Sequence, residues 1–158
     1  MTRVRDQIRM TPDEVAAFLA EPHKLQLATI NRDGTPHLVT MYYVMVDQRI
    51  GFWTYRTSQK AANLRRDPRV SCLVETGDGY DQLRGVLVTG TVEAVDGYDR
   101  VRELGAAIYG RYVDLGDGWD GFIDEQAKKR VAYLVTPQST ASWDHRKLAA
   151  VYAAAGSG

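Results

Sequence analysis

Many of the apolar residues of this chain fall in short runs that are rich in β-branched and aromatic side chains. These runs, bounded by glycine, proline, asparagine or aspartate, occupy residues 24–30, 37–46, 49–55, 69–75, 84–95, 131–136 and 139–143. Such composition and punctuation are typical of β-strands. Turn signals at residues 31–34 and 47–48 join the first three runs, which predicts an antiparallel meander in which residues 37–46 form one long strand.

Other segments repeat their apolar residues with helical spacing. They cover residues 12–20, 58–66, 96–113 and 122–130. Thr11 and Glu14 have the spacing of a capping box at the start of the first segment, and Ser58 is a suitable N-cap for the second. The glycine-rich residues 114–121 predict a loop between the last two helices.

The order of these elements predicts the fold class. Helices stand between some of the strands rather than after every one, and Gly85 and Gly90 are candidate bulge or bend positions in the longest strand. Six or seven short strands of this kind favour a mainly antiparallel β-barrel with peripheral helices. The length suits one domain, so we predict a single domain over residues 1–158, of which residues 153–158 form a disordered tail.

Charge and cysteine content narrow the function classes. Twenty Lys and Arg balance twenty Asp and Glu, so no net charge favours binding to nucleic acid or to an anionic membrane. No apolar run approaches the roughly 18 residues that a membrane span requires. The basic N-terminus lacks the apolar stretch of a signal peptide, and the single cysteine, Cys72, is expected to be a buried, inert thiol. We therefore expect a cytoplasmic protein.

Common catalytic and metal motifs are absent. The chain has no GxGxxG directly after a strand, no phosphate-binding P-loop, no HExxH and no CxxC. His23, His37 and His145 lie far apart without ligand spacing, so we predict no metal site. No carboxylate pair is placed as an acid–base hydrolase requires, and we assign no catalytic side chain.

Residues 51–71 are the informative stretch, because they run from a strand through a tight turn and a helix to another strand. The hydroxyls of Thr54, Thr57 and Ser58 are expected to converge there with the free N–H groups of the first helical turn and the Lys60 amine. Backbone donors and a positive charge at a helix N-terminus suit a phosphate. The alternative is a capped surface helix whose charges are solvated.

This region and its flanks resemble a known family. The segments are LATINRDGTPHLVTMYYV, GFWTYRTSQKAANLRRDPRVSCLVE and VLVTGTVEAV, and the most specific pattern is F-x-T-x-x-x-S-x-K-x-x-N-L-x-x-D-P-R-V over residues 52–70. They are similar to the pyridoxamine 5′-phosphate oxidase-like superfamily of flavin proteins, and most similar to its flavin/deazaflavin oxidoreductases, which are common in actinobacteria. The resemblance spans roughly residues 15–145 and implies a split β-barrel that forms a homodimer with cofactor sites at the subunit interface.

The resemblance also implies which residues contact the cofactor. The matched strand runs along the ring, the next strand ends in an aromatic-threonine pair, and the helix start binds the phosphate. A polar residue of that helix, Asn63, and a weakly matched tryptophan near the C-terminus, Trp143, complete the set. The expected cofactor contacts are Val39, Thr40, Met41, Tyr42, Trp53, Thr54, Ser58, Lys60, Asn63 and Trp143. The oxidases carry an Arg and a Lys in the matched strand. Residues 37–43 contain neither, which disfavours oxidation of pyridoxamine phosphate by this chain.

We therefore interpret the chain as an oxidoreductase that uses the deazaflavin coenzyme F-420 (8-hydroxy-5-deazaflavin). It would transfer hydride to or from a small conjugated organic substrate, with Tyr42, Tyr43 and Trp53 as candidate walls of the substrate pocket. The alternative cofactor is FMN. A rival of another class is a non-enzymatic protein that stores or senses flavin or haem, in which His37 or His145 would be the haem ligand.

Overall fold

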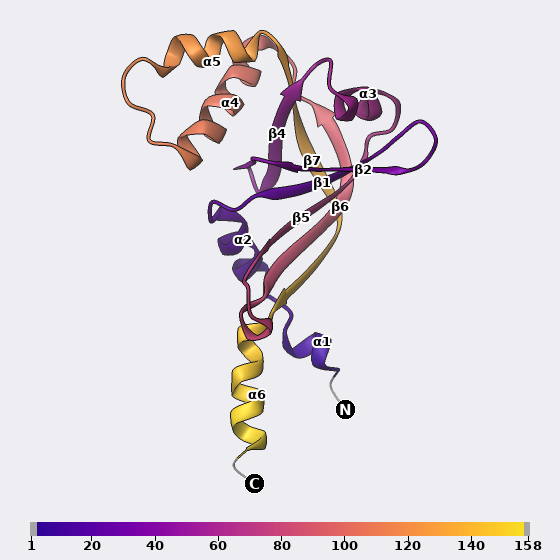
Figure 1. Ribbon diagram of the computed structural model, residues 1–158, viewed down its shortest axis with the longest axis vertical. Coiled ribbons are helices and arrows are strands. Elements are labelled where there is room, and N and C mark those ends of the chain that lie inside the picture. Colours follow the sequence, from indigo (N-terminus) through magenta and orange to yellow (C-terminus); the bar gives the residue numbers. More distant parts are fainter. Residues whose placement is uncertain (1–2, 157–158) are drawn as a thin grey trace.

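The computed structural model describes residues 3–156 and contains one seven-stranded antiparallel sheet with helices around it (Figure 1). The strands are β1 (Leu25–Ile30), β2 (Pro36–Met41), β3 (Val44–Val46), β4 (Arg49–Tyr55), β5 (Arg69–Thr76), β6 (Arg84–Ala94) and β7 (Arg130–Asp144). The α-helices are α1 (Val4–Gln7), α2 (Pro12–Ala20), α3 (Gln59–Arg66), α4 (Tyr98–Tyr112), α5 (Trp119–Ala127) and α6 (Leu148–Ala155). Short 3₁₀ turns, η1 (Tyr80–Gln82) and η2 (His145–Lys147), complete the order.

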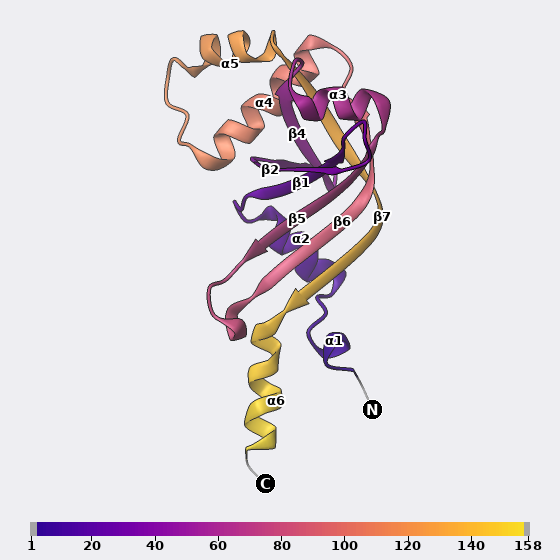
Figure 2. The ribbon, with the colours of Figure 1, turned by 45° about the vertical axis from the view of Figure 1, so that its right-hand side comes forward.

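The sheet curls into a barrel because its two edge strands are joined by only two residues. The strand order is β2-β1-β5-β6-β7-β4-β3, so β2 and β3 lie at opposite edges, yet only Tyr42 and Tyr43 separate them. Three Cα–Cα steps reach about 11 Å at most. The edges must therefore meet. Figure 2 shows the resulting curl, in which β1 and β2 run across the long strands β5, β6 and β7. This mainly β barrel with peripheral helices is the predicted fold class, which is confirmed.

The prediction of one strand over residues 37–46, within a three-stranded meander, is wrong. The chain breaks at Tyr43, whose side chain is fully buried and whose hydroxyl donates to the Leu19 carbonyl at 2.9 Å. This tertiary contact turns the backbone inward and sends β3 to the other edge of the sheet. Asp47 and Gln48 then adopt positive φ in the tight turn to β4, as the turn signal predicted.

Residues 130–144 form one strand where we predicted two. The β6–β7 ladder shifts its register between Thr89 and Gly90, opposite Pro137, and β7 continues past the proline. A Cβ at Gly90 would lie 2.1 Å from the Thr136 carbonyl oxygen, so only glycine fits there without a shift of the backbone. The predicted irregularity at Gly90 is confirmed.

The barrel interior holds the main core, and two helices close it. Side chains of the strands, including Leu27, Phe52 and Val86, are fully buried together with Phe18 of α2 and Leu64 of α3. Helix α2 begins with the predicted capping box of Thr11 and Glu14. Cys72 lies in this core, where burial raises the pKa of its thiol to about 12, so the predicted burial of this thiol is confirmed.

A second cluster packs outside the barrel on β4 and β7. Val101, Leu104 and Ile108 of α4 cover Trp53 and Leu134. Helix α5 begins at residue 119, inside the predicted loop, because the Trp119 ring contacts Tyr109 and Phe122 at centroid distances of 6.0 and 5.3 Å. These aromatic contacts hold α5 against α4.

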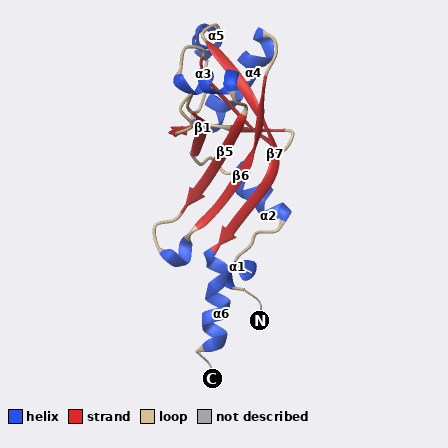
Figure 3. Ribbon diagram, turned by 90° about the vertical axis from the view of Figure 1, so that its right-hand side faces the viewer, coloured by secondary structure: helices blue, strands red, loops and turns tan. Residues whose placement is uncertain are grey.

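By contrast, the outer face of β1, β5, β6 and β7 is half exposed. Leu73, Leu87 and Ala141 are paired across this face, which Figure 3 shows in front of the barrel. Both described ends of the chain lie at the opposite end of the barrel from α3. The predicted tail is corrected, because residues 153–155 complete the alanine-rich helix α6; residues 157–158 lie outside the described part. Within residues 3–156, no helix has the length and apolar character that crossing a bilayer requires.

Candidate functional site

The start of α3 brings two of the predicted phosphate contacts together. Ser58 is the N-cap, and its Oγ accepts hydrogen bonds from the Ala61 amide at 3.2 Å and from the Thr54 hydroxyl at 3.1 Å. The hydroxyl hydrogen of Ser58 remains available to an acceptor outside the helix. The first-turn amides of Gln59 and Lys60 have no partner within the helix. The helix start therefore presents several donors in one place.

Lys60 adds an unpaired positive charge. Its side chain is partly buried, and within residues 3–156 it makes no hydrogen bond or ion pair. Burial lowers the pKa of the Lys60 amine, and the nearby charge of Arg130 lowers it further. The charges of Lys60 and Arg130 are therefore close enough to repel each other, and an anion bound beside them would relieve this repulsion.

Sequence reasoning missed Arg130. Its guanidinium stacks over the rings of Tyr55 and Trp53, 4.1 and 4.8 Å from their centroids, and donates to Gln126 Oε1. Tyr55 pairs with Arg130 in the β4–β7 ladder. This pairing over a long sequence separation brings Arg130 beside α3, and no local pattern in the sequence indicates it.

Asn63 lies inside the protein rather than at an open surface. It is fully buried, and its amide donates to Thr29 Oγ1 and Asn31 Oδ1 at 3.0 Å each. Its Oδ1 accepts from Gln59 and Arg66. Since all of its polar atoms are engaged, Asn63 fastens α3 to the β1–β2 turn and positions the helix start.

Strand β2 offers a free edge beside this helix. It pairs with β1 alone, so half of its backbone N–H and C=O groups lack a strand partner. Leu38, Thr40 and Tyr42 point outward, whereas Val39 and Met41 pack against the core. Val39 and Met41 can therefore meet a ligand outside the barrel only through their backbone.

A hollow of about 510 Å³ connects β2 with α3. It is lined by Asn31, Arg32, Asp33, His37 and Gln59. His37 Nδ1 is buried and has no hydrogen-bond partner in the described chain. Arg32 and Gln59 at this hollow were not predicted, because their surface positions carry no sequence signal. The hollow places polar donors between the strand edge and the helix start.

The structure does not bring the two predicted tryptophans to this hollow. The Trp53 ring is 5% exposed beneath α4, and Tyr43, the other candidate pocket wall, is fully buried. Trp143 packs over Gly85 near the far end of β7, about 40 Å of strand away from Arg130. Within one chain, only Tyr42 of the candidate walls is open, at 54% exposure.

No metal centre accompanies these residues. Within residues 3–156, no group of three histidine, cysteine or acidic side chains could hold a metal ion. His23 binds Glu21 at 2.8 Å, and His145 Nδ1 lies 2.7 Å from the Tyr80 carbonyl oxygen. Both histidines are therefore engaged in local contacts.

Comparison with known proteins identifies the family of the chain. Residues 11–144 match the pyridoxamine 5′-phosphate oxidase family. The conserved hypothetical protein Rv2991 from Mycobacterium tuberculosis is 42% identical over 94% of this chain and 93% of its own, with a TM-score of 0.86. An F-420 reductase is 25% identical over 78% of this chain and 93% of its own (TM-score 0.62).

A haem storage protein, HutZ from Vibrio cholerae, shares the fold at 18% identity, over 82% of this chain and 92% of its own (TM-score 0.64). No curated protein matches this chain in sequence. The family match covers the capped helix α3, the free strand β2 and the hollow between them. The chain belongs to the pyridoxamine 5′-phosphate oxidase-like superfamily of flavin-binding split barrels.

Proposed function

We propose that this protein is an oxidoreductase that binds the deazaflavin coenzyme F-420 and transfers hydride to or from a small conjugated organic substrate. The observation that carries the proposal is the cluster of donors at the start of α3, where Ser58 and the unpaired Lys60 lie near the charge of Arg130. The similar F-420 reductase supports the choice of cofactor. The bound cofactor supplies the hydride chemistry, and the protein supplies binding and orientation.

The residues present fit such a cofactor in two places. The Ser58 hydroxyl, the first-turn amides and the Lys60 amine would hold its phosphate. The free backbone edge of β2 would donate to and accept from the polar edge of the ring. Tyr42, exposed beside this strand, would form one wall of the substrate pocket.

Charge distribution favours the deazaflavin over FMN. The deazaflavin carries a phosphodiester and an anionic tail, whereas the charge of FMN ends at one phosphate. Residues 37–43 contain no Arg or Lys for a compact clamp. Around α3, Arg65 and Arg66 donate to main-chain carbonyl groups and keep their positive charge, while Arg69 is paired with Asp67. Arg65 and Arg66, together with Lys60 and Arg130, would offer positive charge along an extended anion, whereas Arg69 is neutralised by Asp67.

We propose further that the protein is a homodimer with the cofactor at the interface. The half-exposed face of β1, β5, β6 and β7 carries Leu73, Leu87 and Ala141, which a second copy would bury. A second copy also offers a route for Trp143 to reach a cofactor held by α3, since one chain keeps them apart. The predicted cytoplasmic location remains a prediction.

The second candidate function is storage or sensing of haem or flavin without turnover. The buried, unpartnered Nδ1 of His37 favours it, because such an atom lacks a partner in this chain. The similarity in fold to a haem storage protein supports it as well. Visible spectra distinguish the outcomes, because haem, flavin and deazaflavin absorb differently.

The proposal is tested by titrating the purified protein with F-420 and with FMN at low and high salt, following fluorescence quenching. We expect tighter binding of F-420, with an affinity that falls as salt rises, because partly exposed charge pairs are screened. Turnover with a panel of enones and quinones then tests hydride transfer. Binding of FMN at least as tight as that of F-420 at both salt concentrations would exclude the deazaflavin assignment.

A further inference from the structure

The C-terminal end of α4 is bound to the short connection between β2 and β3. The Tyr112 hydroxyl donates to the carbonyl oxygens of His23 and Tyr43, and it lies 3.2 Å from the latter. It also accepts from the Tyr43 amide at 3.5 Å. Burial raises the pKa of Tyr112, so this hydroxyl keeps its proton at neutral pH and can donate. One hydroxyl therefore holds both backbone polar groups of the residue that follows Tyr42.

The Tyr112 ring also contacts the Tyr42 ring directly. The two centroids are 4.6 Å apart, with an interplanar angle of 47°. Tyr42 is 54% exposed, whereas Tyr112 is partly buried, so Tyr112 supports one side of a ring that is open to solvent. Aromatic pairs at such distances attract each other beyond the effect of the area that they bury. Tyr42 is thus held through its ring and through the adjoining main chain by one residue of α4.

Arg111 fixes the end of α4 in turn. Its guanidinium lies over the rings of Tyr43 and Tyr112, 4.3 and 5.7 Å from their centroids. It also donates to the carbonyl oxygens of Leu19 and Glu21. These carbonyl groups lie at the C-terminal end of α2, where helix carbonyls lack partners within the helix. Tyr112 is therefore anchored to α2 as well as to the connection between β2 and β3.

Tyr42 follows directly on the strand edge that is proposed to hold the cofactor ring. His37, at the hollow beside α3, lies near one end of β2, and Tyr42 follows the other end. Strand geometry puts these two residues about 17 Å apart along the chain. A substrate beside the ring at this end of the strand would lie against Tyr42.

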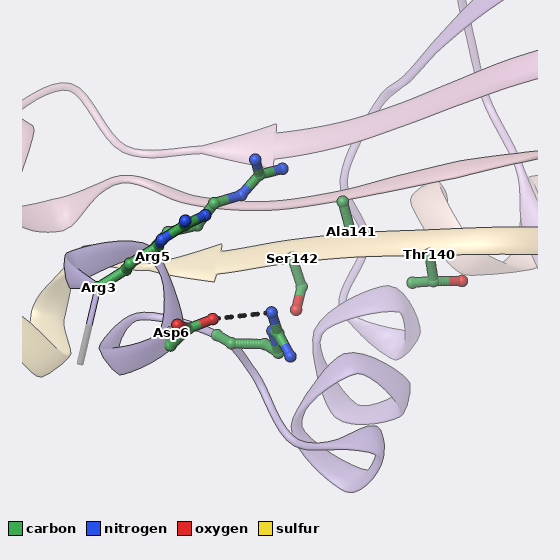
Figure 4. A pocket seen from close by; sticks show the side chains of 7 residues that line it. Arg3, Arg5, Asp6, Thr140, Ala141 and Ser142 are labelled. Carbon is green, nitrogen blue, oxygen red and sulfur yellow. Dashed lines mark hydrogen bonds and ion pairs between the residues drawn. The ribbon is translucent and has the colours of Figure 1, made fainter. Parts of the chain in front are cut away.

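The hollow between α1 and β7 does not offer such a wall. It has a volume of about 700 Å³ and is lined by Arg3, Arg5, Asp6, Arg9, Thr140, Ala141 and Ser142 (Figure 4). None of these side chains is aromatic, and Ala141 lies on the face that the proposed dimer would bury. This hollow therefore does not compete with Tyr42 as an aromatic contact.

We propose that Tyr42 is the specificity-determining wall of the substrate pocket and that Tyr112 is the residue that positions it. This role rests on the proposed function. The wall favours a planar conjugated ring system over an open-chain conjugated substrate of similar size. A flat ring stacks on the tyrosine without further ordering, whereas an open chain loses rotational freedom when it lies flat against the wall.

Binding of two matched probes to the full chain loaded with oxidised F-420 tests the proposal. Menadione is a planar bicyclic quinone, and methyl geranate is an open-chain conjugated ester with the same numbers of carbon and oxygen atoms. Oxidised coenzyme reduces neither probe, so calorimetric titration reports binding alone. Tyr42→Leu should lower the ratio of menadione affinity to methyl geranate affinity by about three- to tenfold, as expected for loss of one aromatic contact. Tyr42→Phe keeps the ring and should keep the ratio.

The positioning role of Tyr112 is tested in the same way. Tyr112→Phe removes only the hydroxyl, and Tyr112→Leu removes the ring contact as well, so the affinity ratio should fall in both and further in the second. Because Tyr112 acts through Tyr42, adding Tyr112→Phe to Tyr42→Leu should cause no additional loss. Tyr98→Phe, at the other end of α4, is the matched control and should leave the ratio unchanged.

The affinity for F-420 separates this proposal from the proposed function. All variants should bind F-420 as tightly as the wild type, because a general loss of structure would weaken F-420 and both probes together. Failure of the wild type to bind F-420 would overturn the proposed function and the role of Tyr42 with it. Normal binding of F-420 with an unchanged probe ratio in Tyr42→Leu would overturn the role of Tyr42 alone. Additive losses in the double variant would overturn the positioning role of Tyr112.

Discussion

The six-membered ring of Trp53 lies against the α-carbon of Gly105, so that a Cβ on this glycine would come within 2.2 Å of the indole. This contact joins β4 to α4. Gly105→Ala should lower the free energy of unfolding by about 1–3 kcal/mol, because the clash outweighs the better helix propensity of alanine. Chemical denaturation of the purified variant measures the difference.

Gly110 is the matched control in the same helix. A Cβ there would lie 3.7 Å from Leu115 Cδ1, which is an ordinary contact. Gly110→Ala should therefore raise the free energy of unfolding by about 0.5–1 kcal/mol. Equal effects of the two substitutions would contradict the close packing of α4 on Trp53.

Removal of the Lys60 amine should weaken cofactor binding without harming the fold. Lys60→Ala should cost about 1.5–3 kcal/mol of binding free energy, the range for a charge-assisted hydrogen bond. Fold stability should hardly change, since Lys60 makes no ion pair within residues 3–156. Fluorescence titration measures affinity, with Lys24→Ala, at an exposed lysine distant in sequence from α3, as control. Unchanged affinity in Lys60→Ala would place the phosphate elsewhere.

Loss of the Asn63 side chain should destabilise the fold. Asn63→Ala leaves buried Thr29 without its donor and frees α3 from Asn31, so we expect a loss of about 2–3 kcal/mol in the free energy of unfolding. Gln59→Ala removes only the bond to Asn63 Oδ1 from an exposed residue, and should cost less than about 1 kcal/mol. Urea denaturation compares the two variants.

Asp144 should make stability depend on pH. The hydrogen-bonded ion pair with Arg146, at 2.7 Å, holds the pKa of the Asp144 carboxyl below its usual value of 3.8. The pair therefore contributes its full stability above that value and loses it as the pH falls through the lowered pKa. Asp144→Asn should cost about 1 kcal/mol at pH 7, because Arg146 is half exposed.

The cost of Asp144→Asn should shrink in strong acid, where the wild-type carboxyl is protonated as well. Unfolding curves at neutral pH and at about pH 2 measure this convergence. Asp78→Asn, in the exposed loop before η1, controls for a general change of charge. A cost that stays constant across this range would mean that the ion pair does not stabilise the fold.

A charge on the half-exposed face should prevent dimer formation. Leu87 lies on this face between Leu73 and Ala141, and Leu87→Glu would place a carboxylate against the second copy. Sedimentation velocity should show a dimer for the wild type at micromolar concentration and a monomer for this variant. Val113→Glu, at an exposed residue after α4, should leave the dimer intact. A monomeric wild type would refute the proposed assembly.

Local signals in the sequence predicted the elements that local contacts stabilise. The capping box of Thr11 and Glu14 and the N-cap of Ser58 each depend on residues within three positions, and the structure has both. The strand break at Tyr43 could not be predicted in this way. It depends on a hydrogen bond to Leu19 and on stacking with Arg111 of α4, 4.3 Å from the ring centroid.

The sequence predicted the helix that begins the candidate site, but only some of the side chains that are accessible there. A sequence pattern places Asn63 and Trp53 near a cofactor, but it does not show that other side chains enclose them. The sequence also does not indicate Arg130, which lies far from Lys60 along the chain. Only the pairing of β4 with β7 brings the two residues together. Burial and long-range pairing are tertiary properties, and a single sequence reports them weakly.

The position of β4 between β3 and β7 has a consequence for how the chain acquires its fold during synthesis. Gly51 of β4 pairs with Leu134, so this apolar strand keeps one open edge until residues 130–134 have left the ribosome. An open apolar edge is where misassembly with other chains begins. Strand pairings between residues so far apart in sequence also slow folding. We therefore expect a slow, aggregation-sensitive final step in which β7 pairs with β4 and the barrel closes.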